Sequence, residues 1–99
     1  MAPLTGKQRR YLRGLGHHLD PVVQVGKGGV TDGIVAAVEQ ALHDHELIKI
    51  RRGSECPADR HEVADALAAR AGAEVVQTLG QTVLLFRQRE KEPDIELPR

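Results

Sequence analysis

A glycine-rich stretch, Gly26-Lys27-Gly28-Gly29, is the part of the sequence whose residue types best suit a binding site. Glycines let the backbone approach a ligand closely and adopt conformations that other residues avoid. Thr31 is a candidate N-cap, so the stretch would precede a helix, whose N-terminal N–H groups and dipole favour an anion. Lys27 adds a flexible cation. The stretch predicts a phosphate clamp, and the alternative is an ordinary tight turn.

A basic cluster near the N-terminus is the second candidate site. If each residue turns by about 100°, five apolar residues share one side of a helix over residues 5–18 and four basic residues share the other. The apolar residues are Leu4, Tyr11, Leu12, Leu15 and Leu19, and the basic residues are Lys7, Arg9, Arg10 and Arg13. We therefore expect a basic outer face, which either binds a polyanion or is merely solvated.

The net charge of zero conceals a polarised chain. Residues 1–30 hold five basic residues and one acidic residue, whereas residues 31–89 and 90–99 each have a net charge of −2. A basic patch on a neutral molecule attracts a polyanion to one face only.

Catalytic and metal-binding patterns are missing from the sequence. Neither a nucleophilic triad nor a pair of glycosidase carboxylates stands out, and the glycine stretch fits neither the Walker nor the Rossmann pattern. His17 and His18 are neighbours that would point about 100° apart on a helix, so they do not readily share an ion. A single cysteine, Cys56, excludes an internal disulfide and a cysteine-based zinc site. We therefore expect a protein that is not an enzyme and that binds no cofactor, metal ion or small-molecule substrate.

Aromatic residues indicate how a nucleic acid would be contacted. Tyr11 and Phe86 are the only two, and both are expected on buried faces. Base-stacking platforms need several exposed rings. Contacts should therefore go to phosphates and to shape.

The remaining patterns predict a helix–strand alternation. Asp20-Pro21 ends the first helix, Asp59 and Glu62 resemble a capping box, and Gly72 ends the third helix. The expected strands are 21–25, 47–51, 73–79 and 82–87, and the later helices run from residue 31 to about 44 and from 59 to 70. The second helix should bury Ile34, Val38, Ala41 and Leu42, and the third Val63, Leu67 and Ala71. The order α-β-α-β-α-β-β predicts a two-layer α/β domain with a mixed four-stranded sheet.

Length and composition indicate one domain. The 99 residues suit a single domain over residues 1–89, followed by an extended, acidic, proline-punctuated tail over residues 90–99 whose removal should cost little stability. No apolar run approaches the ~20 residues that span a bilayer. The first six residues lack the apolar region of a secretory signal. We expect a cytoplasmic monomer without membrane contact.

Three segments carry a family resemblance over essentially the whole chain. They are LTGKQRRYLRGLGHHLDPVVQVGKGGVTDGI, HELIKIR and GAEVVQTLGQTVLLFR, and the terminal IELPR extends the match. The chain resembles the YhbY family of small bacterial RNA-binding proteins, the stand-alone form of the CRM domain. The resemblance implies a fold like the C-terminal domain of translation initiation factor three. It also implies association with precursors of the large ribosomal subunit, with RNA bound at Gly26, Lys27, Gly28, Gly29, Lys7, Arg9, Arg10 and Arg13.

One segment departs from the family pattern. Residues 53–60, GSECPADR, replace a simpler charged turn, which puts only this loop in doubt. Lys49, Arg51 and Arg52 are weaker candidates, because charges that alternate along a strand commonly mark its solvated face. The sequence thus favours an RNA-binding protein in ribosome assembly; the alternative is a protein-interaction module that docks a ribosomal or other protein.

Overall fold

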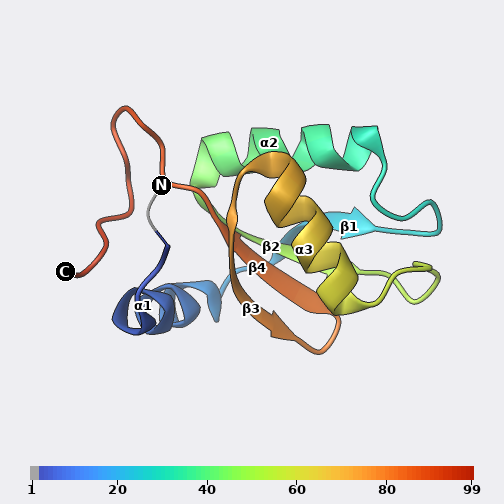
Figure 1. Cartoon of the computed structure of the whole chain (residues 1–99), viewed down its shortest axis with the longest axis horizontal. Coiled ribbons are helices and arrows are strands. Elements are labelled where there is room, and N and C mark those ends of the chain that lie inside the picture. The colour runs from blue at the N-terminus through green and yellow to red at the C-terminus, as the bar shows by residue number, and fades with distance from the viewer. Residues whose placement is uncertain (1–2) are drawn as a thin grey trace.

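The computed structural model describes residues 3–99; Met1 and Ala2, which belong to the stretch expected to lack a secretory signal, lie outside them. Its elements follow the expected order (Figure 1). They are α1 (Gly6–Gly16), β1 (Pro21–Val25), α2 (Asp32–His45), β2 (Leu47–Arg52), α3 (Arg60–Ala71), β3 (Glu74–Leu79) and β4 (Thr82–Phe86). Within the described residues, no helix is long and apolar enough to cross a membrane.

Local signals set the ends of the helices. The Thr5 side chain accepts a hydrogen bond from the Gln8 N–H at 3.1 Å, and the Gln8 side chain accepts one from the Thr5 N–H at 3.0 Å. Asp59 and Glu62 form the predicted capping box before α3. Gly72 ends α3 in the left-handed conformation, with φ of 64°, which favours glycine. Both predictions for α3 are confirmed.

The four strands form one mixed sheet in the order β1-β2-β4-β3. β1 is parallel to β2, whereas β4 is antiparallel to both β2 and β3. Strands linked through a helix are therefore parallel, and β3 and β4 form a hairpin, as predicted. Because β4 lies between β2 and β3, the last strand of the chain occupies the interior of the sheet.

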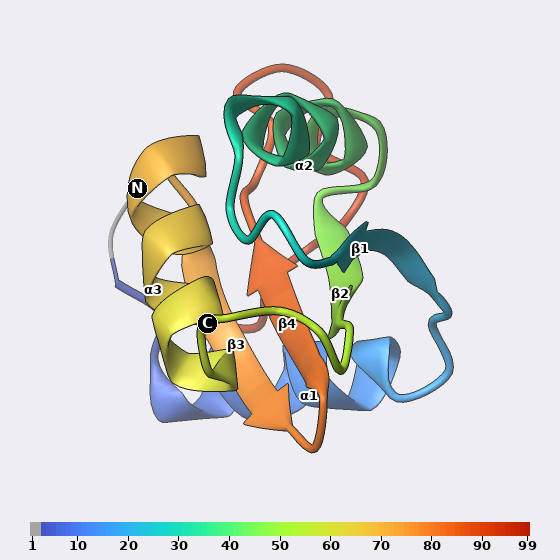
Figure 2. The ribbon, with the colours of Figure 1, turned by 90° about the vertical axis from the view of Figure 1, so that its right-hand side faces the viewer.

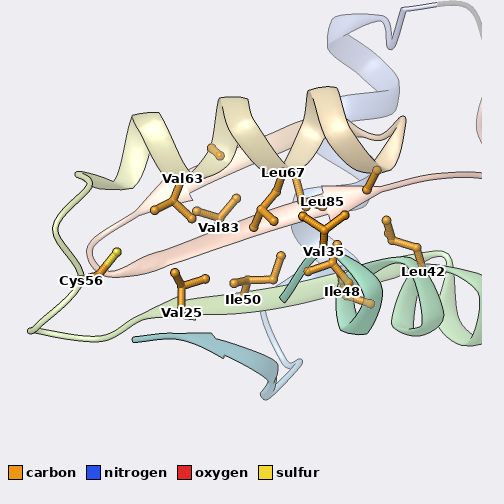
Figure 3. Packing of buried hydrophobic residues seen from close by; sticks show 13 residues of the cluster. Val25, Val35, Leu42, Ile48, Ile50, Cys56, Val63, Leu67, Val83 and Leu85 are labelled. Carbon is orange, nitrogen blue, oxygen red and sulfur yellow. The ribbon is translucent and has the colours of Figure 1, made fainter. Parts of the chain in front are cut away.

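The sheet is covered on both faces. Side chains alternate along each strand, so Ile48 and Ile50 face α2 and α3, whereas Leu47 faces α1. Figure 3 shows the larger cluster, in which Val63 and Leu67 of α3 approach the sheet residues. The smaller cluster comprises Leu4, Leu12, Leu47, Val76, Leu84 and Phe86. The mixed sheet is as predicted, but the molecule has three layers rather than the two expected, because α1 packs on the face opposite α2 and α3 (Figure 2).

The buried side of α1 differs from the side predicted. Gly16 packs directly on the sheet: a Cβ at this position would lie 2.4 Å from Leu84 Cδ2. This close approach turns the helix so that Leu12 is buried while Tyr11 and Leu15 stay 43% and 41% exposed. The expectation that Tyr11 is buried is wrong. It rested on apolar side chains alone and overlooked a glycine that allows close packing.

The second helix also differs in detail from its predicted burial. Val38 and Leu42 are buried as expected, but Ile34 and Ala41 are only half-buried, and Val35 is buried instead. The packing direction of α2 is therefore set by contacts with both the sheet and α3, not by its apolar periodicity alone.

Residues 88–99, here called the C-terminal segment, contain no helix or strand. They nevertheless contact the domain at Glu46, a fully buried residue between α2 and β2. The Glu46 carboxylate accepts hydrogen bonds from the backbone N–H groups of Arg89, Asp94 and Ile95 at 2.7–2.8 Å. Ile95 and Leu97 pack against the cluster beneath α1. The segment therefore has no regular secondary structure, and these contacts hold it against the domain.

Candidate nucleic-acid interface

The GKGG loop, residues 26–29, lies between the end of β1 and the start of α2. The Gly29 N–H donates to the Gly26 carbonyl at 3.0 Å, which closes a turn in which Gly29 has φ of 71°. Lys27 and Gly28 are exposed at its tip. The Thr31 side chain then accepts a hydrogen bond from the Ile34 N–H at 3.2 Å and caps α2. The predicted turn and helix cap are confirmed, and they present backbone N–H groups beside a lysine.

The N-terminus of α2 also carries an acidic residue, Asp32, which the sequence patterns did not indicate as part of the candidate site. Asp32 lies in the first turn, where the helix dipole favours a negative charge. It forms an ion pair with Arg70 of α3, and Arg70 also donates to the Val30 carbonyl. Arg70 thus offsets the negative charge of Asp32 close to the GKGG loop.

A second loop, residues 53–57 and here called the supporting loop, packs against the GKGG loop and the end of β1. The Gly53 N–H donates to the Val25 carbonyl at 2.8 Å, directly before the glycine turn. Pro57 packs on Gly29, where a Cβ would lie 3.6 Å from the proline Cγ. Cys56 is buried between them and the core and forms no disulfide. The segment that departs from the family pattern therefore contacts the candidate site itself. Residue types alone carry no signal for this long-range contact.

Arg52 holds the supporting loop in place. Its guanidinium donates to the carbonyls of Ala58 and Cys56 and to Oε1 of Gln81, the last two at 2.8 and 3.0 Å. These bonds make Arg52 a structural residue. Lys49 is half-buried and Arg51 is exposed, and within residues 3–99 neither side chain makes a hydrogen bond or an ion pair. Of the three weaker candidates, Lys49 and Arg51 are thus available to a ligand.

The four basic residues of α1 fall into two pairs. Arg9 is half-buried and donates to the Val75 carbonyl of β3, and Lys7 Nζ lies 3.2 Å from the carbonyl of Arg99. Arg10 and Arg13 are exposed, and their side chains have no hydrogen-bond or ion-pair partner in the described part of the chain. The expectation that Arg9 belongs to the outer face is wrong, because the packing of Gly16 turns Arg9 towards the sheet. The free basic face comprises Arg10 and Arg13.

The two candidate surfaces are not adjacent. The GKGG loop lies at one end of the longest axis of the molecule, which measures 39 Å, and α1 lies in the opposite half of the molecule (Figures 1 and 2). β1 and β2 run between them. In the parallel register Pro21 pairs with Lys49 and Gln24 with Arg51, on the sheet face that α1 partly covers. Lys49 and Arg51 therefore lie along the path from the basic helix to the loop.

Histidine and acidic side chains do not gather into a metal site. Across residues 3–99, no three His, Cys, Asp or Glu side chains are placed to hold an ion together. The rings of His17 and His18 instead meet edge to face, with centroids 5.2 Å apart.

Comparison with known proteins defines the class. The family model of the CRS1 / YhbY (CRM) domain matches residues 4–87, which span every described element from α1 to β4. The chain belongs to this family.

Two relatives and one solved structure match this chain over nearly their whole length. The chain is 44% identical to "Probable RNA-binding protein YqeI" of Bacillus subtilis over 95 residues, which cover 96% of this chain and 99% of the relative. It is 40% identical to an "RNA-binding protein" of Haemophilus influenzae, with 100% and 99% covered. The solution structure of the hypothetical protein SAV1595 from Staphylococcus aureus is similar, with a TM-score of 0.82, 38% identity, and 96% and 99% covered.

Proposed function

We propose that this chain binds RNA through the GKGG loop and the free basic side chains of α1. The observation that carries the proposal is the loop, an exposed glycine turn that a second loop supports and that presents Lys27 at the N-terminus of α2. Backbone N–H groups at a helix N-terminus suit a phosphate. The names of two relatives, which describe RNA-binding proteins, support RNA as the source of that phosphate.

Contacts to phosphates account for most of the proposed affinity. Lys27, Arg10 and Arg13 are exposed cations, and Lys49 and Arg51 lie between the two surfaces. The net charge of the chain is zero, so attraction comes from this face and not from the molecule as a whole. Lys7 can join by releasing the Arg99 carbonyl, whereas Arg9 remains occupied by β3.

The RNA in this proposal is ribosomal RNA of large-subunit precursors, and the chain acts during ribosome assembly. This part rests on the resemblance to YhbY proteins. Crosslinking the chain to RNA in cells and sequencing the attached fragments tests it. We expect reads enriched in precursor ribosomal RNA of the large subunit. Reads scattered over messengers, with ribosomal RNA not enriched, would contradict the assembly role while leaving RNA binding intact.

A second candidate function is docking to a protein. Leu15, Leu19 and Val22 border an apolar groove of about 480 Å³ between α1, β1 and β2, and Val22 is 52% exposed. An apolar groove on a small domain suits a protein partner. Titration against protein-free precursor RNA separates the two candidate functions. An RNA-binding chain binds this RNA with an affinity that falls steeply with salt, whereas a chain that docks only to protein does not bind it.

A further inference from the structure

A polar hollow of about 400 Å³ opens where the sheet ends beside the GKGG loop. Its lining residues come from β1, β2, the supporting loop and the turn of the β3–β4 hairpin. They are Gln24, Arg51, Arg52, Gly53, Ser54 and Gln81. Gln24 and Arg51 are partners in the parallel register, so their side chains stand side by side on one face. The hollow is thus built by four segments that only the fold brings together.

One wall of the hollow is fixed by hydrogen bonds. The Arg52 N–H donates to the Gln81 carbonyl at 2.7 Å, and Arg52 Nη1 donates to Gln81 Oε1 at 3.0 Å. The opposite side is free: within residues 3–99, the side chains of Gln24, Arg51 and Ser54 are exposed and make no hydrogen bond or ion pair. A guanidinium, a carboxamide and a hydroxyl are therefore available to a ligand against a rigid wall.

Gly53 connects the hollow to the GKGG loop. A Cβ at Gly53 would lie 3.2 Å from both Gln24 Nε2 and the Val25 carbonyl oxygen, and 3.8 Å from Gly26 Cα. Glycine at this position therefore lets the supporting loop pack against the first residue of the glycine turn. A strand whose phosphate sits at the GKGG loop would have its neighbouring nucleotide next to the hollow.

We propose that this hollow receives one nucleotide of the RNA strand whose phosphate the GKGG loop holds; this rests on the proposed function. Its volume lies within the range of small-molecule sites. An Arg guanidinium stacks on a base or donates to its edge, and a Gln carboxamide both donates and accepts. The Ser54 hydroxyl suits a ribose 2′-OH. Phosphate contacts carry no base information, so this hollow would give the chain a base preference.

The experiment compares four short single-stranded RNA oligonucleotides, each built from one of the four nucleotides. The test variant is Gln24→Ala with Arg51→Lys, which keeps the charge and removes the carboxamide and the planar guanidinium. We expect the parent to prefer one oligonucleotide. In the variant that affinity should fall about tenfold, to the level of the others, with the salt dependence unchanged. The matched control is Gln40→Ala with Lys91→Arg, at exposed positions away from the hollow.

Each outcome separates this proposal from the proposed function. A parent that binds none of the oligonucleotides and no precursor RNA contradicts RNA binding itself. A parent that binds all four equally, or a variant that keeps the preference, overturns the nucleotide site and leaves RNA binding standing. A variant weakened equally for all four, with a flatter salt dependence, places Arg51 on phosphate and also overturns the site. If thermal melting shows that the double variant is unfolded, Arg51→Lys alone carries the test.

Discussion

Single residues at contacts between elements decide how the candidate site is displayed. Gly16 is the example at α1, because it lies against Leu84 and so sets which basic side chains remain free. At Gly14, two residues earlier, no atom of residues 3–99 lies within 4 Å of an added Cβ, apart from its chain neighbours and the helix backbone. The two glycines of one helix therefore have different roles.

This difference is testable by substitution. Gly16→Val should lower the free energy of unfolding by about 1–3 kcal/mol, because its side chain overlaps Leu84 in a packed interface. Gly14→Val, the matched control, should change it by no more than about 0.5 kcal/mol. Urea unfolding followed by circular dichroism measures both. Equal effects of the two substitutions would show that α1 does not pack through Gly16.

The GKGG loop is testable without loss of the fold. Lys27→Asp combined with Gly28→Asp places two negative charges where the proposed phosphate sits. Apart from its chain neighbours, a Cβ at Gly28 would meet one atom of the described residues, Thr31 Cγ2 at 3.4 Å. Gly28 does not have a positive φ, so an Asp side chain fits at this position. Carboxylates near a helix N-terminus are also favourable to the helix.

We expect RNA affinity in a filter-binding titration to fall by far more for this double variant than for Lys27→Ala, which removes only one cation. Thermal melting run in parallel should give a similar midpoint for all three proteins. A folded double variant that binds RNA as the parent does would exclude the loop and leave α1 as the candidate surface.

Asp59 provides a prediction for pH. The Glu62 backbone N–H, which donates to its carboxylate, is the main reason that the pKa of Asp59 lies below its ordinary value of 3.8. A carboxyl whose pKa is lowered on folding stabilises the protein above its unfolded pKa, and this stabilisation is lost as the pH falls through the folded pKa. Asp59→Asn keeps a capping oxygen but does not ionise. The urea midpoint of the parent should exceed that of the variant at neutral pH, and the difference should shrink in acid. A constant difference across this range would contradict the assignment.

At the scale of elements, the C-terminal segment acts as a strap. It runs from β4 past Glu46 and back to α1, where the carbonyl of Pro98 accepts a hydrogen bond from Gln8 Nε2 at 3.1 Å. The sequence suggested that residues 90–99 are dispensable, because prolines and charges rarely form a core. The buried Glu46 carboxylate leads us to expect the opposite.

Removal of residues 90–99 should lower the free energy of unfolding by about 2 kcal/mol or more. The truncation takes away two N–H donors from a buried carboxylate, together with the packing of Ile95 and Leu97. Chemical denaturation measures the loss, and Glu90→Ala with Lys91→Ala is the control, because it removes two exposed charged side chains of the same segment and keeps the backbone. A truncated chain as stable as the parent would show that these contacts contribute nothing in solution. RNA affinity should be unchanged or higher, since acidic residues are removed and Lys7 is released.

At the scale of the whole molecule, the separation of α1 from the GKGG loop requires an RNA that reaches both. The molecule is 39 Å long, and the two surfaces lie towards different ends of it. A long RNA should therefore contact both surfaces, whereas a short oligonucleotide bound at the GKGG loop should not reach α1.

Arg10→Ala with Arg13→Ala tests this arrangement. On a long RNA, the loss of two phosphate contacts should flatten the slope of log affinity against log salt by roughly 1.5. On a short oligonucleotide that cannot span the molecule, the slope should remain near that of the parent. Arg60→Ala with Lys91→Ala removes the same charge elsewhere and serves as the control. An unchanged slope on long RNA would show that this face of α1 is only solvated.

Short-range patterns in the sequence were sufficient for the elements and for the glycine turn. The caps at Thr31 and Asp59 and the stop at Gly72 involve hydrogen bonds or dihedral angles within a few residues, so the residue types there fix the local backbone. The order of helices and strands along the chain likewise predicted the mixed sheet, because strands linked through a helix are expected to be parallel and the last two strands antiparallel. The family resemblance, carried by motifs in order, was confirmed by the match over residues 4–87.

Tertiary structure alone decided which of these residues are free to act. Arg9 and Arg52 are of a residue type that suits RNA binding, yet in the fold their side chains donate hydrogen bonds to backbone carbonyls. Contacts such as Gly16 with Leu84 and Glu46 with Ile95 join residues far apart in the chain, and no local pattern encodes them. The same holds for the polar hollow, whose lining comes from four segments. Local hydrogen bonding fixes the elements, whereas side-chain availability depends on how the elements pack, and only the folded chain determines that packing.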